Sequence, residues 1–420
     1  MRFVSRRYTR LAAATANDIS PLLFLVAGFV GILQTNYEWV DWRGYEMVTI
    51  AKNLVDNGAF ANPFFAANTG PTAANPPLYP LVLAFLMKFL QLPLLVHGAA
   101  LLGSIGANAI TAALLPYVSF LFFGEVISGA LASVLWLGAM QPTPTWDTSY
   151  TVAGLLAFVL LTASDINKDK HVVSRGALAG IVAGLLFLLN PSSLLVFLPW
   201  LFYLYLSRRA HAPHALKYCF VLLVAMCILP VGWAARNYRQ LGAFVVRTNL
   251  GMTLYTSDND CAQSTLRQEL SSGCYKAHHP NLNVKEAELL RSLGEVRYDR
   301  MRIADTRNWI FSNPGRFCRL TLTRIRDFWF PPAEVGSWYH AHFISIITAL
   351  SLPGLILMGY RREPVTPFVV GVLLLYPLMY YIVVTDTRYR YPILWLSLLP
   401  AGYCVWHLVR LGKPPYDSRS

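Results

Sequence analysis

The stretch from Asn36 to Gln91 contains the residues most suited to chemistry. It opens with Tyr37-Glu38-Trp39-Val40-Asp41-Trp42-Arg43-Gly44-Tyr45-Glu46, which combines carboxylates, an arginine and aromatic rings. An apolar segment precedes it, so its start lies just outside a membrane. Ionisable groups at a membrane are costly unless they bind something, but a solvated loop with aromatic residues at the headgroups has a similar composition. Two hypotheses follow, an active site on the outer side of a bilayer or an interfacial loop.

A second carboxylate, Asp147, lies between two apolar segments in the sequence Gln141-Pro-Thr-Pro-Thr-Trp-Asp-Thr-Ser-Tyr150. Aspartate is favoured at the first, capping position of a helix. The carboxylate could therefore belong to the same site as Asp41, or it could cap the helix that follows.

A third group of charged residues occurs near the end of the chain, in Thr385-Asp386-Thr387-Arg388-Tyr389-Arg390-Tyr391-Pro392. Arginine binds phosphate in a bidentate manner, so Arg388 and Arg390 are candidates for a phosphate site. The alternative is an interfacial anchor of tyrosine and arginine. Arginine on the outer side opposes the usual charge bias of membrane proteins, which favours the functional hypothesis.

Cys261 and Cys274 lie in one long hydrophilic segment, and an oxidising exterior would favour a disulfide between them. His278 and His279 are adjacent in the same segment. A metal site there would need a third ligand that the pattern does not identify, so we predict a surface turn before Pro280 and no metal site.

The composition is that of a membrane protein. Of the 420 residues, 55% are hydrophobic and 14% are charged, and the mean hydropathy is +0.43. These values exclude an ordinary soluble domain. The formal net charge of +13 indicates basic cytoplasmic loops in contact with anionic lipids. No aromatic-plus-basic motif indicates nucleic-acid binding.

The order of apolar segments predicts an all-α polytopic fold. The segments lie near 19–35, 77–91, 97–122, 127–141, 149–164, 176–190, 192–207, 218–234, 341–359, 365–384 and 393–411. A helix over 77–91 would rise only about 22 Å, against a hydrocarbon core of about 30 Å. We therefore expect about ten transmembrane helices and one juxtamembrane helix at 77–91.

The basic loops support this topology. If 77–91 does not cross, the loops Lys168–Arg175, Arg208–Lys217 and Arg361–Arg362 all lie in the cytoplasm, as the positive-inside rule requires. Asp41, Asp147, Asn190-Pro191 and Arg388 then share the outer side. We expect an N-terminal transmembrane module at 1–235 with its first outer loop at 36–96, an outer subdomain at 236–340 and C-terminal transmembrane helices at 341–420.

The 236–340 segment reads as a small α-rich subdomain. Asn283 and Glu286 have the spacing of a capping box, a helical pattern continues to Ser312 with a break at Gly294, and Asn313-Pro314 ends it. A further helix carries Arg316, Arg319, Arg324 and Arg326 beside apolar residues. Such a helix is expected to lie on an anionic membrane surface.

Several short motifs carry a family resemblance. Asp41-x-x-x-Tyr45 is followed by Ala51-Lys-Asn-Leu, Gly58-Ala-Phe, Gly70-Pro-Thr-Ala and Pro76-Pro-Leu-Tyr-Pro; later come Ala235-Arg-Asn-Tyr, Gly294-Glu-x-x-Tyr and Arg388-Tyr-Arg-Tyr-Pro. In this order they resemble the GT-C superfamily of polyprenyl-phosphate-dependent membrane glycosyltransferases. The resemblance is to the bacterial branch grouped with the glycosyltransferase family 39, mannosyltransferase and aminoarabinose-transferase proteins, and it covers nearly the whole chain.

The resemblance implies a catalytic acidic residue at Asp41, and by position alone a second one at Asp147. Many members have Asp-Glu or Asp-x-Asp in the first outer loop, whereas this chain has Asp41-Trp42, so adjacency does not supply a carboxylate pair. We expect the substrate-binding residues to be Arg43, Tyr45, Glu46, Tyr79, Arg236, Arg388 and Arg390.

The activity implied is inverting transfer of a sugar from a polyprenyl-phosphate donor, on the outer face of a bacterial inner membrane. A glycan, a lipid or a protein would be the acceptor, and membrane lipids would surround the enzyme. No cofactor is required by the pattern, and a divalent cation stays open. The alternatives are a lipid-linked oligosaccharide ligase or polymerase, and a transporter or flippase of lipid-linked sugars. A transporter is expected to have internal repeats or charges at mid-membrane, which the sequence lacks.

Overall fold

The computed structural model describes residues 6–35, 45–166, 170–207, 212–333 and 338–411. Within these ranges the chain is helical, and strand pairing is limited to the isolated bridges Ala61–Pro71 and Thr265–Thr385. Every apolar segment of the sequence forms a helix. The structure therefore confirms a polytopic all-α membrane protein.

Seven of these helices are long and apolar enough to cross a membrane. They are α1 (Arg6–Gln34), α4 (Pro93–Phe123), α6 (Thr148–Asp165), α7 (Val172–Leu189), α9 (Ala212–Leu241), α16 (Trp338–Tyr360) and α19 (Tyr391–Leu411). The shorter apolar helices are α3 (Leu78–Leu90), α5 (Ile127–Ala139), η2 (Pro191–Ser193) with α8 (Leu194–Ser207), and α17 (Thr366–Leu375) with α18 (Leu378–Tyr381).

Small residues let the membrane helices pack closely. A Cβ at Gly180 of α7 would collide with the backbone carbonyl of Leu222 in α9, and one at Gly184 would collide with that of Met226. Lipid tails are as apolar as leucine, so close packing rather than the hydrophobic effect holds such helices together. The spacing of four residues places both glycines on one face of α7.

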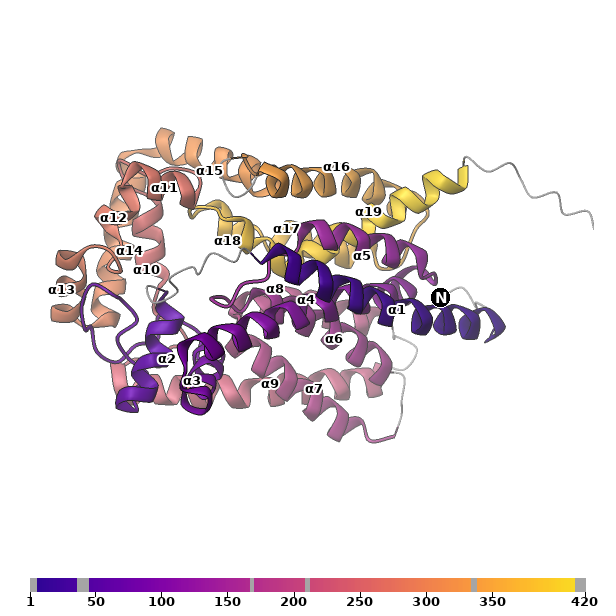
Figure 1. Ribbon diagram of the computed structural model, residues 1–420, viewed down its shortest axis with the longest axis horizontal. Coiled ribbons are helices and arrows are strands. Elements are labelled where there is room, and N and C mark those ends of the chain that lie inside the picture. Colours follow the sequence, from indigo (N-terminus) through magenta and orange to yellow (C-terminus); the bar gives the residue numbers. More distant parts are fainter. Residues whose placement is uncertain (1–5, 36–44, 167–169, 208–211, 334–337, 412–420) are drawn as a thin grey trace, which may run out of the picture.

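The hydrophilic helices gather at one end of the bundle (Figure 1). There α2 (Glu46–Asn57) lies near α10–α14, whereas α1 begins at the opposite end. The helices of the 236–340 segment are α10 (Leu250–Ser257), α11 (Leu266–Ser272), α12 (Cys274–His278), α13 (Val284–Leu293), α14 (Glu295–Ser312) and α15 (Pro314–Trp329). We call α10–α15 the outer subdomain, after the side of the membrane on which we predict it to lie.

Local signals in the outer subdomain explain where its helices begin and end. The Asn283 side chain accepts a hydrogen bond from the Glu286 backbone N–H, as the capping pattern predicts. The Glu286 carboxylate does not complete the box, because it accepts from Tyr298 Oη at 2.5 Å and from Arg302 Nε at 2.8 Å. Gly294, with φ +75°, separates α13 from α14.

The prediction that all four arginines of α15 face a membrane surface is wrong for Arg324. That side chain is fully buried and forms an ion pair with Asp258, with Nη1 to Oδ1 at 2.9 Å. Arg324 also donates to the backbone carbonyl of Ser257. The pair ties α15 to the end of α10, and removing one partner would leave a buried charge without compensation. Spacing along a helix does not reveal this, because the partner is far away in the sequence.

Glu269 of α11 is a second buried charge next to this pair. Its side chain is fully buried, and Oε1 accepts a hydrogen bond from the Gln263 backbone N–H at 2.6 Å. Oε2 has no hydrogen-bond partner within the described residues. Burial raises the pKa of the Glu269 carboxyl to about 7.

Segment 77–91 forms only the 13-residue helix α3, about 20 Å long, and we predict that it does not cross the membrane. Cysteines placed at Asn68 and Gln91, on either side of α3, should therefore both react with a membrane-impermeant thiol reagent on intact cells. Cysteine at the exposed Ser174 should react only after permeabilisation. Labelling of position 68 but not 91 would show that α3 spans.

Glu269→Gln should change how stability depends on pH. A carboxyl whose folded pKa is raised favours folding while protonated, and this contribution disappears as the pH rises from about 4.5 to about 7. The amide removes that loss, so its thermal midpoint in detergent should exceed that of the wild type above pH 7 and match it near pH 4. The difference is of order 2–3 kcal/mol. Glu288→Gln, at an exposed position, is the control and should leave the profile unchanged. If the thermal midpoints of wild type and Glu269→Gln depend on pH in the same way, the pKa of Glu269 is not raised by burial.

Candidate active site

Asp147 stands at the start of α6 but does not cap it. Its Oδ2 accepts hydrogen bonds from Thr151 Oγ1 at 3.0 Å and from Asn190 Nδ2 at 3.0 Å, and no backbone N–H at the helix start donates to it. The side chain is almost fully buried, and this burial raises the pKa of the carboxyl. Helix capping therefore does not explain why this position has a carboxylate.

Asn190, in the hairpin between α7 and η2, holds Asp147 in a defined orientation. Its Oδ1 accepts from the Ser192 backbone N–H at 3.1 Å and from Ser192 Oγ at 2.7 Å. The backbone N–H is a donor only, so the oxygen of the amide must face it and the Nδ2 group must face Asp147. Ser192 Oγ in turn lies 2.9 Å from Tyr376 Oη. A hydrogen-bonded chain thus joins Asp147 to the C-terminal helices.

Glu46 is the first residue of α2 and lies within the predicted first outer loop, 36–96. Its Oε2 accepts from Asn75 Nδ2 at 3.1 Å, and its Oε1 lies 3.5 Å from His279 Nε2. His279 Nδ1 accepts from the Asn281 backbone N–H, so the ring proton of the neutral form is on Nε2 and faces Glu46. Burial lowers the pKa of His279, and its ring stacks on Tyr275.

Arg247, between α9 and α10, is the cation of this site. Its Nε donates to the Ala74 backbone carbonyl at 2.8 Å, and its charge interacts with Glu46, Asp147, Tyr380 and Tyr389. The side chain is accessible to water although protein surrounds its guanidinium, and this crowding lowers its pKa. Its two Nη groups have no hydrogen-bond partner in the described part of the chain, so they can receive an anionic ligand.

The sequence offered no means of choosing Arg247. The 236–340 segment has 15 lysines and arginines, and Arg247 belongs to no recognisable motif. It follows α9 by six residues, where the chain turns back toward α2, and only the fold shows this.

Arg388 lies in the short helix η4 (Thr387–Tyr389), on a platform of aromatic rings. Its guanidinium carbon is 3.8 Å from the centre of the Trp146 ring, and Tyr45 contacts the same ring edge-on at 5.6 Å. The Tyr389 ring stacks on Tyr380 at 4.9 Å. The charge of Arg247 is influenced by both Tyr380 and Tyr389, so we assign the two arginines to one candidate site.

Tyr79, predicted to bind substrate, is buried and donates to the Pro144 backbone carbonyl at 2.6 Å. It therefore positions the segment that leads to Asp147. Asp41 and Arg43 lie outside the described residues. Tyr45 and Glu46, which follow them directly, both belong to the site.

The two remaining predicted arginines make other contacts. Arg390 is 1% exposed and donates to Trp329 O at 3.0 Å and Thr348 Oγ1 at 2.6 Å, so it joins α15, α16 and η4. Arg236 donates to the backbone carbonyls of Thr72 and Phe60 at 2.7 and 2.8 Å. We interpret Arg390 as a residue that holds helices together, and Arg236 borders a separate cavity, considered below.

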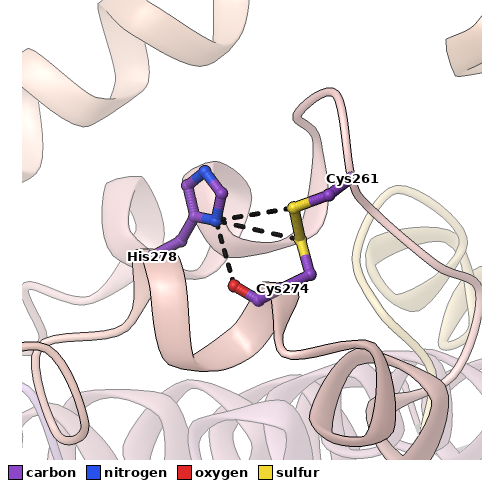
Figure 2. A group of neighbouring side chains, drawn as sticks. All are labelled: Cys261, Cys274 and His278. Atoms are coloured by element: carbon purple, nitrogen blue, oxygen red, sulfur yellow. Dashed lines mark hydrogen bonds between the residues drawn. A yellow bond between two sulfur atoms is a disulfide. The ribbon is translucent and has the colours of Figure 1, made fainter.

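Figure 2 shows the one group of three potential metal ligands among the described residues, formed by Cys261, Cys274 and His278. The two cysteines form a disulfide, with Cα atoms 5.7 Å apart, and His278 Nδ1 lies 3.8 Å from each sulfur. The thiolate is the metal-binding form of cysteine. With the disulfide closed, this group does not fit a metal ion, and the histidine instead contacts Cys274 O at 3.0 Å.

Comparison with protein-family models and with curated proteins finds no match. Solved structures do match. One is the archaeal oligosaccharyltransferase AglB from Archaeoglobus fulgidus in complex with an inhibitory peptide and a dolichol-phosphate, with a TM-score of 0.53, 11% identity and 96% of this chain covered. The Archaeoglobus fulgidus oligosaccharyltransferase in complex with Zn and sulfate has a TM-score of 0.55 at 11% identity, with 93% covered.

The chain shares the fold of these archaeal oligosaccharyltransferases. The apo form of the same archaeal enzyme matches equally, with a TM-score of 0.55 at 10% identity. This chain covers 52%, 49% and 53% of the three structures, so it spans about half their length. At this identity the similarity extends to the fold, and the chemistry has to be argued from the site.

Proposed function

We propose that this chain is a membrane glycosyltransferase that takes a sugar from a polyprenyl phosphate and transfers it to an acceptor on the outer face of a bacterial inner membrane. The proposal rests on the environment of Arg247. Within the described residues its Nη groups have no hydrogen-bond partner, its charge interacts with those of Glu46 and Asp147, and Arg388 belongs to the same candidate site. A lipid phosphate is the anion that such a site at a membrane rim would meet.

The reaction needs few groups from the protein. The acceptor oxygen forms a bond to C1 of the sugar while the bond from C1 to the phosphate oxygen breaks, and the polyprenyl phosphate leaves with the electron pair. The acceptor hydroxyl loses its proton to a carboxylate. One displacement inverts the configuration at C1. Negative charge grows on the leaving phosphate, so arginines placed there act mainly in the transition state.

The roles follow from position and environment. Asp41 is the proposed base, from its place in the first outer loop four residues before Tyr45. Asp147, with its raised pKa and fixed orientation, is the second carboxylate of the site. Glu46 and Tyr45 would contact the sugar, and Arg247 with Arg388 would hold the phosphate. Arg43 would approach the same site from the first outer loop.

A second candidate function is transfer of a whole lipid-linked oligosaccharide. The structures that share the fold are oligosaccharyltransferases, and one of them holds a dolichol-phosphate. An enzyme of that kind would use the same phosphate site but would accept a longer glycan. Donors with one sugar and with several sugars, offered to the same protein, separate the two.

Asp41→Asn should abolish transfer while leaving folding unchanged. The amide has the same shape but is a very poor base, so the rate should fall by at least about a hundredfold. The measurement uses purified protein in liposomes with a polyprenyl-phosphate sugar, and detects covalent product by mass spectrometry. Movement of the lipid across the bilayer without a new glycosidic bond would show a flippase instead. Asp147→Asn is run beside it, and addition of a chelator shows whether a divalent cation takes part.

Arg247→Gln should lower turnover by about a hundredfold, the usual effect of removing one group that stabilises transition-state charge. Arg247→Lys keeps the charge and should recover part of that loss. Arg291→Gln, an exposed arginine of the outer subdomain, is the matched control and should behave as wild type. Equal turnover in Arg247→Gln and Arg291→Gln would remove Arg247 from the phosphate site.

A further inference from the structure

A separate cavity lies at the outer end of α9. It has a volume of about 370 Å³ and is bordered by the segment after α2, by Leu81 of α3, and by Trp233, Arg236 and Gln240 of α9. None of these residues belongs to the site of Arg247 and Asp147. The buried segment Thr72–Asn75 separates the two places, because Arg236 contacts it at Thr72 and Arg247 contacts it at Ala74.

Arg236 has hydrogen-bonding capacity left for a ligand in this cavity. Its Nη1 group donates to Thr72 O and Asn237 Oδ1, and Nη2 donates to Phe60 O. The Nε–H and the second Nη2 hydrogen have no partner among the described residues. The guanidinium lies against two aromatic rings that contact each other, 4.9 Å from the centre of Trp233 and 5.4 Å from that of Phe60. Three contacts hold the guanidinium in place, and its unused donors, Nε–H and one Nη2 hydrogen, are of the kind that binds a phosphate.

The length of α9 leads us to place the cavity at headgroup depth. The membrane-spanning part of α9, Pro213–Leu241, has 29 residues, so it is about 43 Å long, against a hydrocarbon core of about 30 Å. Arg236 is five residues before its end and follows directly on the apolar run 218–234. Arg239 is exposed one turn further on and does not line the cavity.

An apolar track leads away from the cavity along α3. Leu81, Phe85 and Phe89 are four residues apart and therefore share one face of the helix. They are 48%, 60% and 66% exposed, and the two phenylalanine rings are 4.4 Å apart. An exposed apolar stripe that begins at an arginine cavity matches a molecule with an anionic head and a hydrocarbon chain.

We propose that the cavity of Arg236 and Gln240 binds the phosphate of an anionic membrane phospholipid, whose acyl chain lies along Leu81, Phe85 and Phe89 of α3. The occupant is a bilayer lipid and is distinct from the sugar donor. The phosphate accepts from Arg236 Nε and Nη2, and the Gln240 amide completes the head site. Because Arg236 also holds Thr72, the bound lipid would stabilise the segment that leads to Asn75 and Glu46.

Photo-crosslinking tests the site without requiring any transfer activity. The full chain in detergent is given phosphatidylglycerol with a photoreactive acyl chain, and cross-linked peptides are identified by mass spectrometry. Label should appear in the peptides that cover 54–61, 81–89 and 233–240. Excess unlabelled phosphatidylglycerol should remove it, whereas diacylglycerol, which lacks the phosphate, and inorganic phosphate, which lacks the chains, should not.

The test variant and its control each replace one arginine of α9 by glutamine. Arg236→Gln should reduce labelling by about tenfold, because charge-assisted hydrogen bonds dominate phosphate binding, and Arg239→Gln should leave it near the wild-type level. If Arg236→Gln does not fold, Leu81→Trp fills the cavity without touching the arginine and should lower labelling as well. Unchanged labelling in Leu81→Trp, or equal competition by diacylglycerol, would overturn the proposal. Competition by inorganic phosphate would assign the cavity to a free anion instead of a lipid.

Discussion

The end of the bundle that carries α10–α14 depends on the hydrogen bonds of one short buried segment, Thr72–Asn75. Thr72 N donates to Phe60 O, and Thr72 O accepts from Arg236. Ala73 N donates to the Glu295 carboxylate, and Ala73 O accepts from Thr248 N. Ala74 O accepts from Arg247. Buried backbone groups have to be paired, and here most partners come from parts of the chain more than 150 residues away. The backbone groups of this segment are therefore paired only when α2, α9 and α14 are all in place. Its last residue, Asn75, then holds Glu46.

This arrangement explains why motifs far apart in the chain occur together. Gly70-Pro-Thr-Ala supplies the segment, Ala235-Arg-Asn-Tyr supplies Arg236, and Gly294-Glu-x-x-Tyr supplies Glu295 as the first residue of α14. Glu295 accepts from both Ala73 N and Thr248 Oγ1. Three motifs that resemble active-site signatures thus meet mainly through structural contacts. Arg390 is a similar case, since its guanidinium joins α15 to α16. A charged residue in a motif is evidence of a defined environment, and the environment decides whether the residue binds substrate or backbone.

Hydropathy was sufficient to predict the helices, because a membrane span is a local property of about 20 residues. Charge bias was sufficient to predict that Asp147 and Asn190 share one end of the bundle, and the structure places them in hydrogen-bond contact. Neither property distinguishes one arginine from another. Arg324 has the spacing of a surface residue but is buried against Asp258, and Arg247 has no motif but faces the site. Both outcomes depend on contacts between segments that sequence spacing does not encode.

The arrangement of hydrogen bonds leaves Arg247 available for a ligand. Two carboxylates lie near it, and an unsatisfied carboxylate would bind the guanidinium tightly. Asp147 already accepts from Thr151 and Asn190, and Glu46 from Asn75, with His279 facing its other oxygen. Neutral donors thus satisfy both acids without cancelling the charge of Arg247, whose only hydrogen bond within the described residues uses Nε. Among the described residues the Nη groups therefore stay open to a ligand. An incoming phosphate would then break no ion pair formed by these residues, and breaking a buried ion pair is costly.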